Sequence, residues 1–398
     1  MAKNAAWTVM VLMGANNILA NEADLRKRAK DDINEMMKVG SKKNVLNIVV
    51  QIDQPEGARR FKVAKGKREF DEAVPDKWQG GIGGPELLED FVVWSKDLCE
   101  ADKYMLVLWG HAYRLAFNRT PQEPEGLDFP ELANVLKNTN SRRKKIDIVA
   151  FDSCNTCLLE AAYELRKTAS YLVASQFTDP LPGWPYDTVL NRILNDRNFE
   201  RKLTYLADAN GPKDFGRAIV SQFVRNYQGK DSVTMTMLDL SQVEQIAERV
   251  EELSDELIQA VQADEEERSR ISEIFKRCQV PGPTPVGQPS VDLLALCWNL
   301  STFSGSDEVR IAAAAVGDSL LIPRGVPTGG RAGENSFVVA HGRNDLVGSM
   351  LQGVSIFAPN VVGNGFDSRS LRARYRRLEF AKNTHWDELV FALAESEF

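Results

Sequence analysis

The chain has 398 residues, which is enough for one large domain with additions or for two domains. Hydrophobic residues make up 43% of the chain and charged residues 26%, as in an ordinary globular protein. The formal net charge of −7 argues against a general nucleic-acid binder, because such a protein needs a basic surface to meet the phosphates.

Targeting signals and membrane segments are not evident. The opening MAKNAAWTVMVLMG lacks the pattern of a signal peptide, because its apolar run is short and no small-residue cleavage site follows. No stretch approaches the roughly 18 to 20 apolar residues that a membrane helix needs. Five cysteines, an odd number, do not indicate a disulfide framework. We therefore expect a cytoplasmic protein with reduced thiols, no membrane span and no nucleic-acid partner.

The N-terminal part predicts buried strands separated by helices. The apolar runs at 7–14 and 45–52 are typical of strands, and apolar positions at helical spacing indicate a helix over 21–39. A polar, Gly-rich stretch follows, in which residues 60–70 favour a β-hairpin. Pro85 is well suited to the first turn of a helix that reaches about residue 101.

The middle of the chain continues this alternation. Strands are expected at 104–109, 146–151 and 171–174, with helices at 130–137 and from 154 to about 167. The strands are apolar throughout, as expected where helices cover both faces of a sheet. Strand–helix alternation gives a parallel sheet with right-handed crossovers. We therefore predict an α/β fold.

The character of the sequence changes after residue 185. The later elements are mainly helical, and the expected ones are a helical region at 186–227, a strand at 232–238, a long amphipathic helix at 243–261, helices between 291 and 320, and a strand at 354–357. We divide the chain into a core over 1–190 and a mainly helical C-terminal part over 191–398, whose late strands return to the core.

Two strand ends carry reactive side chains. The strand at 104–109 is followed by His111, and the strand at 146–151 continues into Asp152-Ser153-Cys154. Ligands of open parallel sheets bind at the carboxyl ends of the strands, so we expect these side chains to share a site. A thiol and an imidazole at one site suggest a nucleophile and a general base.

The sequence also suggests how such a pair would work. We place Cys154 at the start of a helix, where the helix dipole favours the thiolate. The backbone N–H groups of Cys154 and Ala112 are candidates for an oxyanion hole. Two alternatives stay open at this point: His341 is a rival base, and a cysteine in such a place is often an inert buried thiol.

Cys154 and Cys157 form a C-x-x-C motif at a strand–helix junction, which can indicate a thiol–disulfide oxidoreductase. The motif lacks a preceding Trp and lies inside a longer α/β pattern. We expect Cys157 to lie one turn into the helix and to face the core. Mutation of Cys157 separates the two hypotheses, because a redox enzyme needs this thiol and a peptidase does not.

Several segments, in order along nearly the whole chain, carry a family resemblance: WTVMVLMGANN, DINEMMKVGSKKNVLNIVVQID, LVLWGH, LDFPELANVL, IVAFDSC, YLVASQFTDPLPGWPY and GVSIFAP. The chain resembles the clostripain-like cysteine peptidases, family C11, which are relatives of caspases, legumain and gingipains. The resemblance implies a caspase-like α/β/α sandwich around a mostly parallel sheet, with a catalytic core over 1–190 and a helical C-terminal addition.

The same resemblance implies a cysteine endopeptidase in which His111 and Cys154 form the catalytic dyad. It also implies cleavage of protein or peptide substrates after Arg or Lys. An acidic residue at the base of the specificity pocket would pair with that basic side chain. Asp179 is our candidate, with a turn-capping aspartate as the structural alternative. Further candidates for substrate binding are Asp152, Ser153 and Asp187.

One departure from the family concerns the residue after the histidine, which is usually Gly and here is Ala112. Alanine can still supply an oxyanion N–H, unless the backbone needs a positive φ at that position. The non-enzyme alternative is an inactive pseudo-peptidase that acts as a scaffold or sensor. The intact Cys154 and His111 argue against it.

Relatives often mature by self-cleavage between the histidine and cysteine strands. Arg114 and Arg119 are candidate cleavage sites here, and residues 142–145 form a second basic region. We predict no metal and no cofactor. Some relatives use calcium, but the chain has no EF-hand-like loop, so calcium use stays undetermined. The sequence predicts a regulated intracellular role and gives no oligomeric state.

Overall fold

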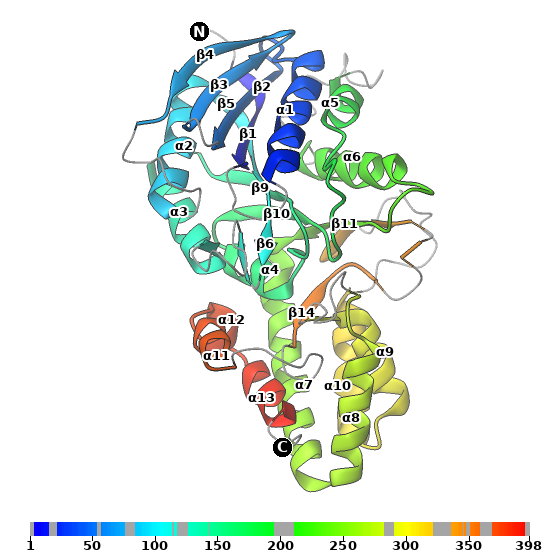
Figure 1. Cartoon of the computed structure of the whole chain (residues 1–398). Coiled ribbons are helices and arrows are strands. Elements are labelled where there is room, and N and C mark those ends of the chain that lie inside the picture. The colour runs from blue at the N-terminus through cyan, green and yellow to red at the C-terminus, as the bar shows by residue number, and fades with distance from the viewer. Residues whose placement is uncertain are drawn as a thin grey trace.

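The computed structural model describes most of the chain. The described residues are 4–15, 22–53, 57–75, 84–113, 115–117, 126–142, 144–194, 211–281, 290–320, 336–344, 346–347, 351–358 and 368–394. Figure 1 shows a twisted sheet flanked by helices, with a helical C-terminal part below it.

A nine-stranded sheet is the centre of the fold. Its strands are, in spatial order, β13 (Val338–Arg343), β11 (Thr234–Asp239), β10 (Ala169–Ala174), β9 (Ile146–Asp152), β5 (Ala101–Trp109), β1 (Ala5–Gly14), β2 (Leu46–Asp53), β3 (Arg59–Ala64) and β4 (Lys67–Ala73). The strands from β10 to β2 are parallel, and antiparallel strands extend the sheet at both sides. The β-hairpin expected around 60–70 is the β3–β4 pair.

Helices cover both faces of the sheet, as the apolar strands predict. On β1, Val9 and Val11 face one hydrophobic cluster, whereas Met10 and Leu12 face the other. The first cluster includes residues of α1 (Glu22–Val39), α5 (Tyr186–Leu194) and α6 (Gly211–Asn226). The second includes residues of α2 (Pro85–Leu98), α3 (Phe129–Arg142) and α4 (Leu159–Leu165).

The C-terminal half contributes both strands and helices. Its strands β11 and β13 join the main sheet beside β10, and β12 (Ser290–Asp292) pairs with β14 (Ser355–Phe357) in a small separate sheet. Its helices after α6 are α7 (Val243–Ala263), α8 (Glu265–Arg277), α9 (Leu293–Phe303), α10 (Asp307–Leu320), α11 (Ser368–Tyr375), α12 (Glu379–Lys382) and α13 (Trp386–Ala394), with the short 3₁₀ turn η2 (Leu240–Gln242) before α7. The predicted α/β sandwich with a helical C-terminal addition is thus confirmed.

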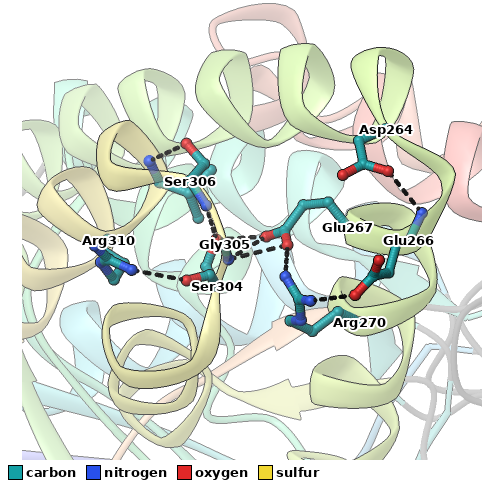
Figure 2. Close-up of polar contacts among 9 residues, drawn as sticks. Asp264, Glu266, Glu267, Arg270, Ser304, Gly305, Ser306 and Arg310 are labelled. Atoms are coloured by element: carbon teal, nitrogen blue, oxygen red, sulfur yellow. Dashed lines mark hydrogen bonds and ion pairs between the residues drawn. The ribbon is translucent and has the colours of Figure 1, made fainter.

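A buried carboxylate connects two of these helical segments (Figure 2). Glu267 of α8 accepts hydrogen bonds from the Ser304 hydroxyl at 2.6 Å and from the Gly305 N–H at 2.9 Å, in the turn between α9 and α10. Arg270 pairs with the same carboxylate and also with the exposed Glu266. The negative charge of Glu267 is therefore matched inside the protein, as a buried charge requires.

The segment after β5 leads away from the sheet edge. It forms a small three-stranded sheet of β6 (Ala112–Tyr113), β7 (Ala116–Phe117) and β8 (Leu127–Asp128). No helix among the described residues is long and apolar enough to cross a membrane.

Candidate active site

The two predicted reactive residues lie at the same edge of the sheet. Trp109 of β5 is in register with Asp152 of β9, and the Gly110 N–H donates to the Asp152 carbonyl at 3.2 Å. His111 and Cys154 each follow two residues after this registered pair. Because β5 and β9 are adjacent and parallel, both side chains emerge at the carboxyl edge, where ligands of such sheets bind.

His111 is partly buried. Burial lowers the pKa of its imidazole below the ordinary value, because the charged form loses hydration. The imidazole is therefore neutral at neutral pH and able to accept a proton. The next residue, Ala112, is not among the residues with a positive φ, so its backbone conformation does not require glycine.

Cys154 has surroundings that differ from the prediction. The helix that follows it, α4, begins only at Leu159, so Cys154 does not lie at a helix N-terminus. Burial, followed by the negative charge of Asp179, raises the pKa of the Cys154 thiol to about 12. The expected lowering of this pKa by the helix dipole is therefore wrong for this conformation.

A turn replaces the expected first turn of helix. Asn155 takes a positive φ of 54°, and its N–H donates to the Phe177 carbonyl at 3.0 Å. The N–H groups of Thr156 and Cys157 both donate to the Ser175 carbonyl at 2.9 Å. These bonds attach residues 154–157 to the loop after β10, and this attachment holds the backbone out of the α-helical conformation.

The loop after β10 covers the thiol. The Asp179 N–H lies 3.3 Å from Cys154 Sγ, and the Asp179 carbonyl oxygen lies 3.8 Å from it. Both side-chain oxygens of Asp179 are buried, and within the described part of the chain neither forms a hydrogen bond of normal geometry. The Ser175 side chain and the Ser153 backbone still interact with this carboxyl group and partly offset the rise in its pKa. Burial first, and then the charge of Asp152, raises the pKa of the Asp179 carboxyl group well above its ordinary value.

Asp152 is buried beside the same loop. Its carboxylate accepts hydrogen bonds from the Tyr186 hydroxyl at 2.9 Å and from the Trp184 N–H at 3.3 Å. Burial raises its pKa to about 7. Ser153 is buried, and its hydroxyl has no hydrogen-bond partner among the described residues. The remaining pocket candidate, Asp187, forms a 2.9 Å ion pair with Lys38, so its charge is already matched.

Asp32 is a nearby acid that the sequence analysis did not single out. It lies on α1, is buried, and accepts a hydrogen bond from Trp109 Nε1 at 2.7 Å. A signal was present in the sequence, because Asp32 occupies the apolar face of α1 between Ala29 and Met36 at helical spacing. A carboxylate on such a face has to be explained by its surroundings.

The rival residues lie elsewhere. His341 is on β13, and β10 and β11 separate that strand from β9. His341 Nδ1 lies 2.9 Å from the Thr236 hydroxyl, and burial lowers the pKa of its imidazole to about 4. Cys157 is fully buried, as expected, although it precedes α4, and its thiol lies 3.1 Å from the Gly353 carbonyl. All five cysteines are free, so Cys154 and Cys157 form no disulfide.

The remaining expectations from the sequence concern self-cleavage, for which two arginines were candidates, and metal binding, for which no site was predicted. Arg114 and Arg119 lie outside the described residues. Among the described residues, Glu251, Asp255 and His385 could together hold a metal ion, because a carboxylate oxygen from each acid and a ring nitrogen of the histidine all lie within 4.8 Å of one another. His385 Nδ1 already contacts both carboxylates, at 2.9 and 2.7 Å, and this group belongs to the C-terminal helical part.

Comparison with known proteins gives the family. The sequence pattern of the clostripain family matches residues 16–391, which is nearly the whole chain. The chain belongs to the clostripain family. Clostripain of Hathewaya histolytica is 27% identical to it over 232 residues, which are 48% of this chain and 43% of that protein. The family assignment made from the sequence motifs is confirmed.

Solved structures of the same family share the fold. An inactive zymogen C11 protease from Parabacteroides distasonis has a TM-score of 0.65 and 16% identity, with 96% of this chain and 99% of that one covered. A secreted C11 cysteine protease from Bacteroides thetaiotaomicron has a TM-score of 0.63 and 14% identity, with the same coverage. A structure of a secreted C11 cysteine protease from the same organism with an irreversible peptide inhibitor has a TM-score of 0.60 and 16% identity, and 96% of this chain and 99% of that one are covered.

Proposed function

We propose that this member of the clostripain family is a cysteine endopeptidase that cleaves after Arg or Lys. In this proposal Cys154 is the nucleophile and His111 is the general base. The observation that carries it is the register of β5 and β9, which brings a neutral imidazole and a thiol to the carboxyl edge of adjacent strands.

The reaction follows from these two groups. His111 takes the proton of the Cys154 thiol, and the sulfur attacks the carbonyl carbon of the peptide bond. The backbone N–H groups of Cys154 and Ala112 stabilise the oxyanion that forms. His111 then gives the proton to the leaving amine as the C–N bond breaks, which leaves a thioester. Water, deprotonated by His111, hydrolyses the thioester and restores the free thiol.

The acids beside Cys154 support a basic substrate side chain. Asp152 is buried, the two carboxyl oxygens of Asp179 are buried, and the pKa of each carboxyl group is raised. A guanidinium or ammonium group placed against them would supply the missing positive charge and would favour their ionised forms. A neutral or acidic side chain would leave these carboxyl groups unmatched. This difference gives specificity for Arg and Lys over Leu and Asp.

The resting conformation does not yet have a reactive thiol. Cys154 Sγ lies against the backbone of Asp179, and its pKa of about 12 leaves very little thiolate at neutral pH. Movement of the loop at 175–183 away from Cys154 would expose the sulfur to His111 and open the acidic pocket at the same time. We therefore propose that activation moves this loop.

Fluorogenic peptides with Arg, Lys, Leu or Asp before the scissile bond test the proposal. We expect turnover of the Arg and Lys peptides, and a loss of roughly a thousandfold or more in kcat/KM for Cys154→Ala and for His111→Ala, because the two groups act as one unit. Matched controls are Cys157→Ala, which removes the other thiol of the C-x-x-C motif, and His341→Asn, which removes the rival base. Both should keep kcat/KM within a few-fold of the parent.

Each contrary outcome identifies a different error. Activity that survives Cys154→Ala excludes the thiol mechanism. Disulfide-exchange activity that is lost in Cys157→Ala, in a folded chain that cleaves none of the peptides, favours the oxidoreductase alternative. A preference for Asp or Leu contradicts the role of the acidic pocket. A folded, processed chain that cleaves none of the peptides supports the pseudo-peptidase.

A further inference from the structure

Asp32 connects the segments that carry the proposed site. Its carboxylate accepts the Trp109 indole N–H at 2.7 Å, at the end of the strand that leads to His111. Gly183, in the loop that covers Cys154, leaves little room for a side chain and has a positive φ of 65°. A Cβ there would lie 3.2 Å from both Asp152 side-chain oxygens and 3.4 Å from an oxygen of Asp32. The two carboxyl groups therefore flank the same glycine.

The pair lies in an acidic environment. Burial, and then the charge of Asp152, raises the pKa of Asp32 to about 9, whereas the pKa of Asp152 is about 7. Other charges that act on Asp32 are those of Glu35 and Asp31 on its own helix, which are also acidic. Two buried carboxyl groups that flank one glycine do not both ionise readily, and the stronger rise in the pKa of Asp32 favours Asp32 as the group that keeps a proton.

A structural role does not account for an acid at this position. An amide oxygen would accept the same indole hydrogen bond, and an amide would avoid the cost of burying a carboxyl group beside other acids. The property that distinguishes Asp32 from an asparagine is its ability to release a proton. When a cation approaches, it lowers the pKa of the nearby carboxyl groups and so favours their ionised forms.

We propose that Asp32 is a specificity-determining residue. When a basic side chain binds against Asp152 and Asp179, Asp32 releases its proton into solvent. The site therefore gains a further negative charge only when a cation is present. The inference rests on the proposed cleavage after basic residues. Asp32 acts behind Asp152 and does not touch the substrate. A neutral side chain gains no binding energy from this ionisation. The difference in affinity between basic and neutral side chains is therefore larger than it would be without Asp32.

The titratable groups around Asp32 come from several elements. Those whose charge or hydrogen bonds act with it are Asp152 of β9, Tyr186 of α5, Tyr227 after α6, and Glu35 and Asp31 of α1. The pKa of each of the two tyrosines is raised, so both are neutral at pH 8. His111 is also neutral there, because its pKa is lowered. Asp152 and Asp179, whose pKa values are also raised, can release protons to a bound cation as well. The release that belongs to Asp32 is therefore the part that is lost in Asp32→Asn.

Calorimetry of a reversible inhibitor pair measures this proton. The active full-length enzyme is titrated at pH 8 with a peptide aldehyde that ends in arginine and with the matched aldehyde that ends in citrulline, its neutral isostere. Each titration is repeated in two buffers of different ionisation enthalpy, which gives the number of protons released. Subtraction of the citrulline result removes the proton changes that belong to Cys154 and His111.

We expect the arginine aldehyde to release more protons than the citrulline aldehyde, and this excess should be close to one proton larger in the parent enzyme than in Asp32→Asn, because release from Asp179 is common to both proteins. Affinity for the arginine aldehyde should rise several-fold from pH 7.5 to 9 in the parent, because less work is needed to remove the proton as pH nears the pKa of Asp32. Affinity for the citrulline aldehyde should stay flat over this range.

The outcomes separate this inference from the proposed function. Equal affinity for the two aldehydes contradicts the preference for basic residues itself. Stronger binding of the arginine aldehyde without extra proton release leaves that preference standing and overturns the role of Asp32. Equal release in the parent and in Asp32→Asn also overturns it. If Asp32→Asn does not fold, the pH dependence of the parent decides, and a flat affinity for the arginine aldehyde refutes the inference.

Discussion

The sulfur of Cys154 lies 3.3 Å from the Asp179 backbone nitrogen, in a pocket of acidic side chains and backbone dipoles. A thiol in such surroundings resists ionisation, because burial disfavours the thiolate and neither a cation nor a helix N-terminus among the described residues stabilises it. His111, the expected partner, is neutral and half-buried. At the scale of single residues, therefore, both reactive groups of the proposed mechanism are present but not yet activated.

Alkylation with iodoacetamide measures this state. At pH 8 we expect Cys154 in the intact, unprocessed chain to react roughly a hundredfold or more slowly than a cysteine in a short peptide, because the thiolate is the reacting form and its pKa is about 12. Peptide mapping locates the label, and Cys154→Ser shows how much label reaches the other cysteines. Labelling of Cys154 as fast as the peptide thiol would contradict the raised pKa.

The sequence predicted the site at this scale only in part. His111 and Cys154 could be placed at two strand ends because each follows an apolar run that ends in polar residues. Such a pattern involves only neighbouring residues, so it can be recognised in the sequence. The state of the thiol depends on bonds between residues 154–157 and the loop at 175–177, which no local pattern encodes. Asp32 was missed for a related reason, since its partners lie on β5 and β9, far away in sequence.

The elements of the core were predicted well for a physical reason. Strands buried on both faces must be mainly apolar, so β1, β2, β5 and β9 appear in the sequence as mainly apolar runs. The start of α4 was predicted five residues early, because the Thr156 and Cys157 N–H groups donate to Ser175 and not into a helix. The late strand β14 was found, but its partner β12 was not, because three residues give little pattern.

Glu267 gives a stability prediction at the scale of elements. Glu267→Ala removes the acceptor for the Ser304 hydroxyl and the Gly305 N–H between α9 and α10, as Figure 2 shows. We expect a loss of about 2 to 3 kcal/mol in the free energy of unfolding, because hydrogen bonds to a buried charge are lost and their donors stay partly buried.

The neighbouring Glu266 supplies a matched control. Its side chain pairs with the same Arg270 but is 81% exposed. Glu266→Ala should therefore cost less than about 1 kcal/mol, as is usual for surface ion pairs. Chemical denaturation of the two variants gives both values. Equal losses in the two variants would show that the ion pair with Arg270, and not the buried hydrogen bonds, is what stabilises the contact between α8 and the α9–α10 turn.

At the scale of the whole molecule, the covered thiol raises the question of activation. Relatives include one described as an inactive zymogen, and the basic residues Arg114 and Arg119 lie between the histidine and cysteine strands. We predict that the purified chain is cut after one of them by its own activity, and that Cys154→Ala stays intact. Intact-mass spectrometry measures the fragments, and Arg114→Gln with Arg119→Gln should also prevent the cut.

Self-cleavage and thiol reactivity should change together. If cleavage releases the loop at 175–183, the alkylation rate of Cys154 should rise in the cut chain and remain low in the Arg114→Gln, Arg119→Gln double variant. A Cys154→Ala chain that is still cut during expression would assign the cleavage to another protease. If the alkylation rate of Cys154 is the same in the cut and uncut chains, self-cleavage does not expose the thiol and another event must activate it.

The antiparallel pairing of β10 with β11 has a consequence for how the protein is made. Synthesis runs from the N-terminus, so β10 leaves the ribosome long before residues 234–239 arrive to pair with it, and β13 follows later still. During that interval the outer side of β10 is an open strand edge that can pair with another chain. The core is therefore protected from this association only after β11 has been made. The candidate site beside β10 acquires its final support only when most of the chain has been synthesised.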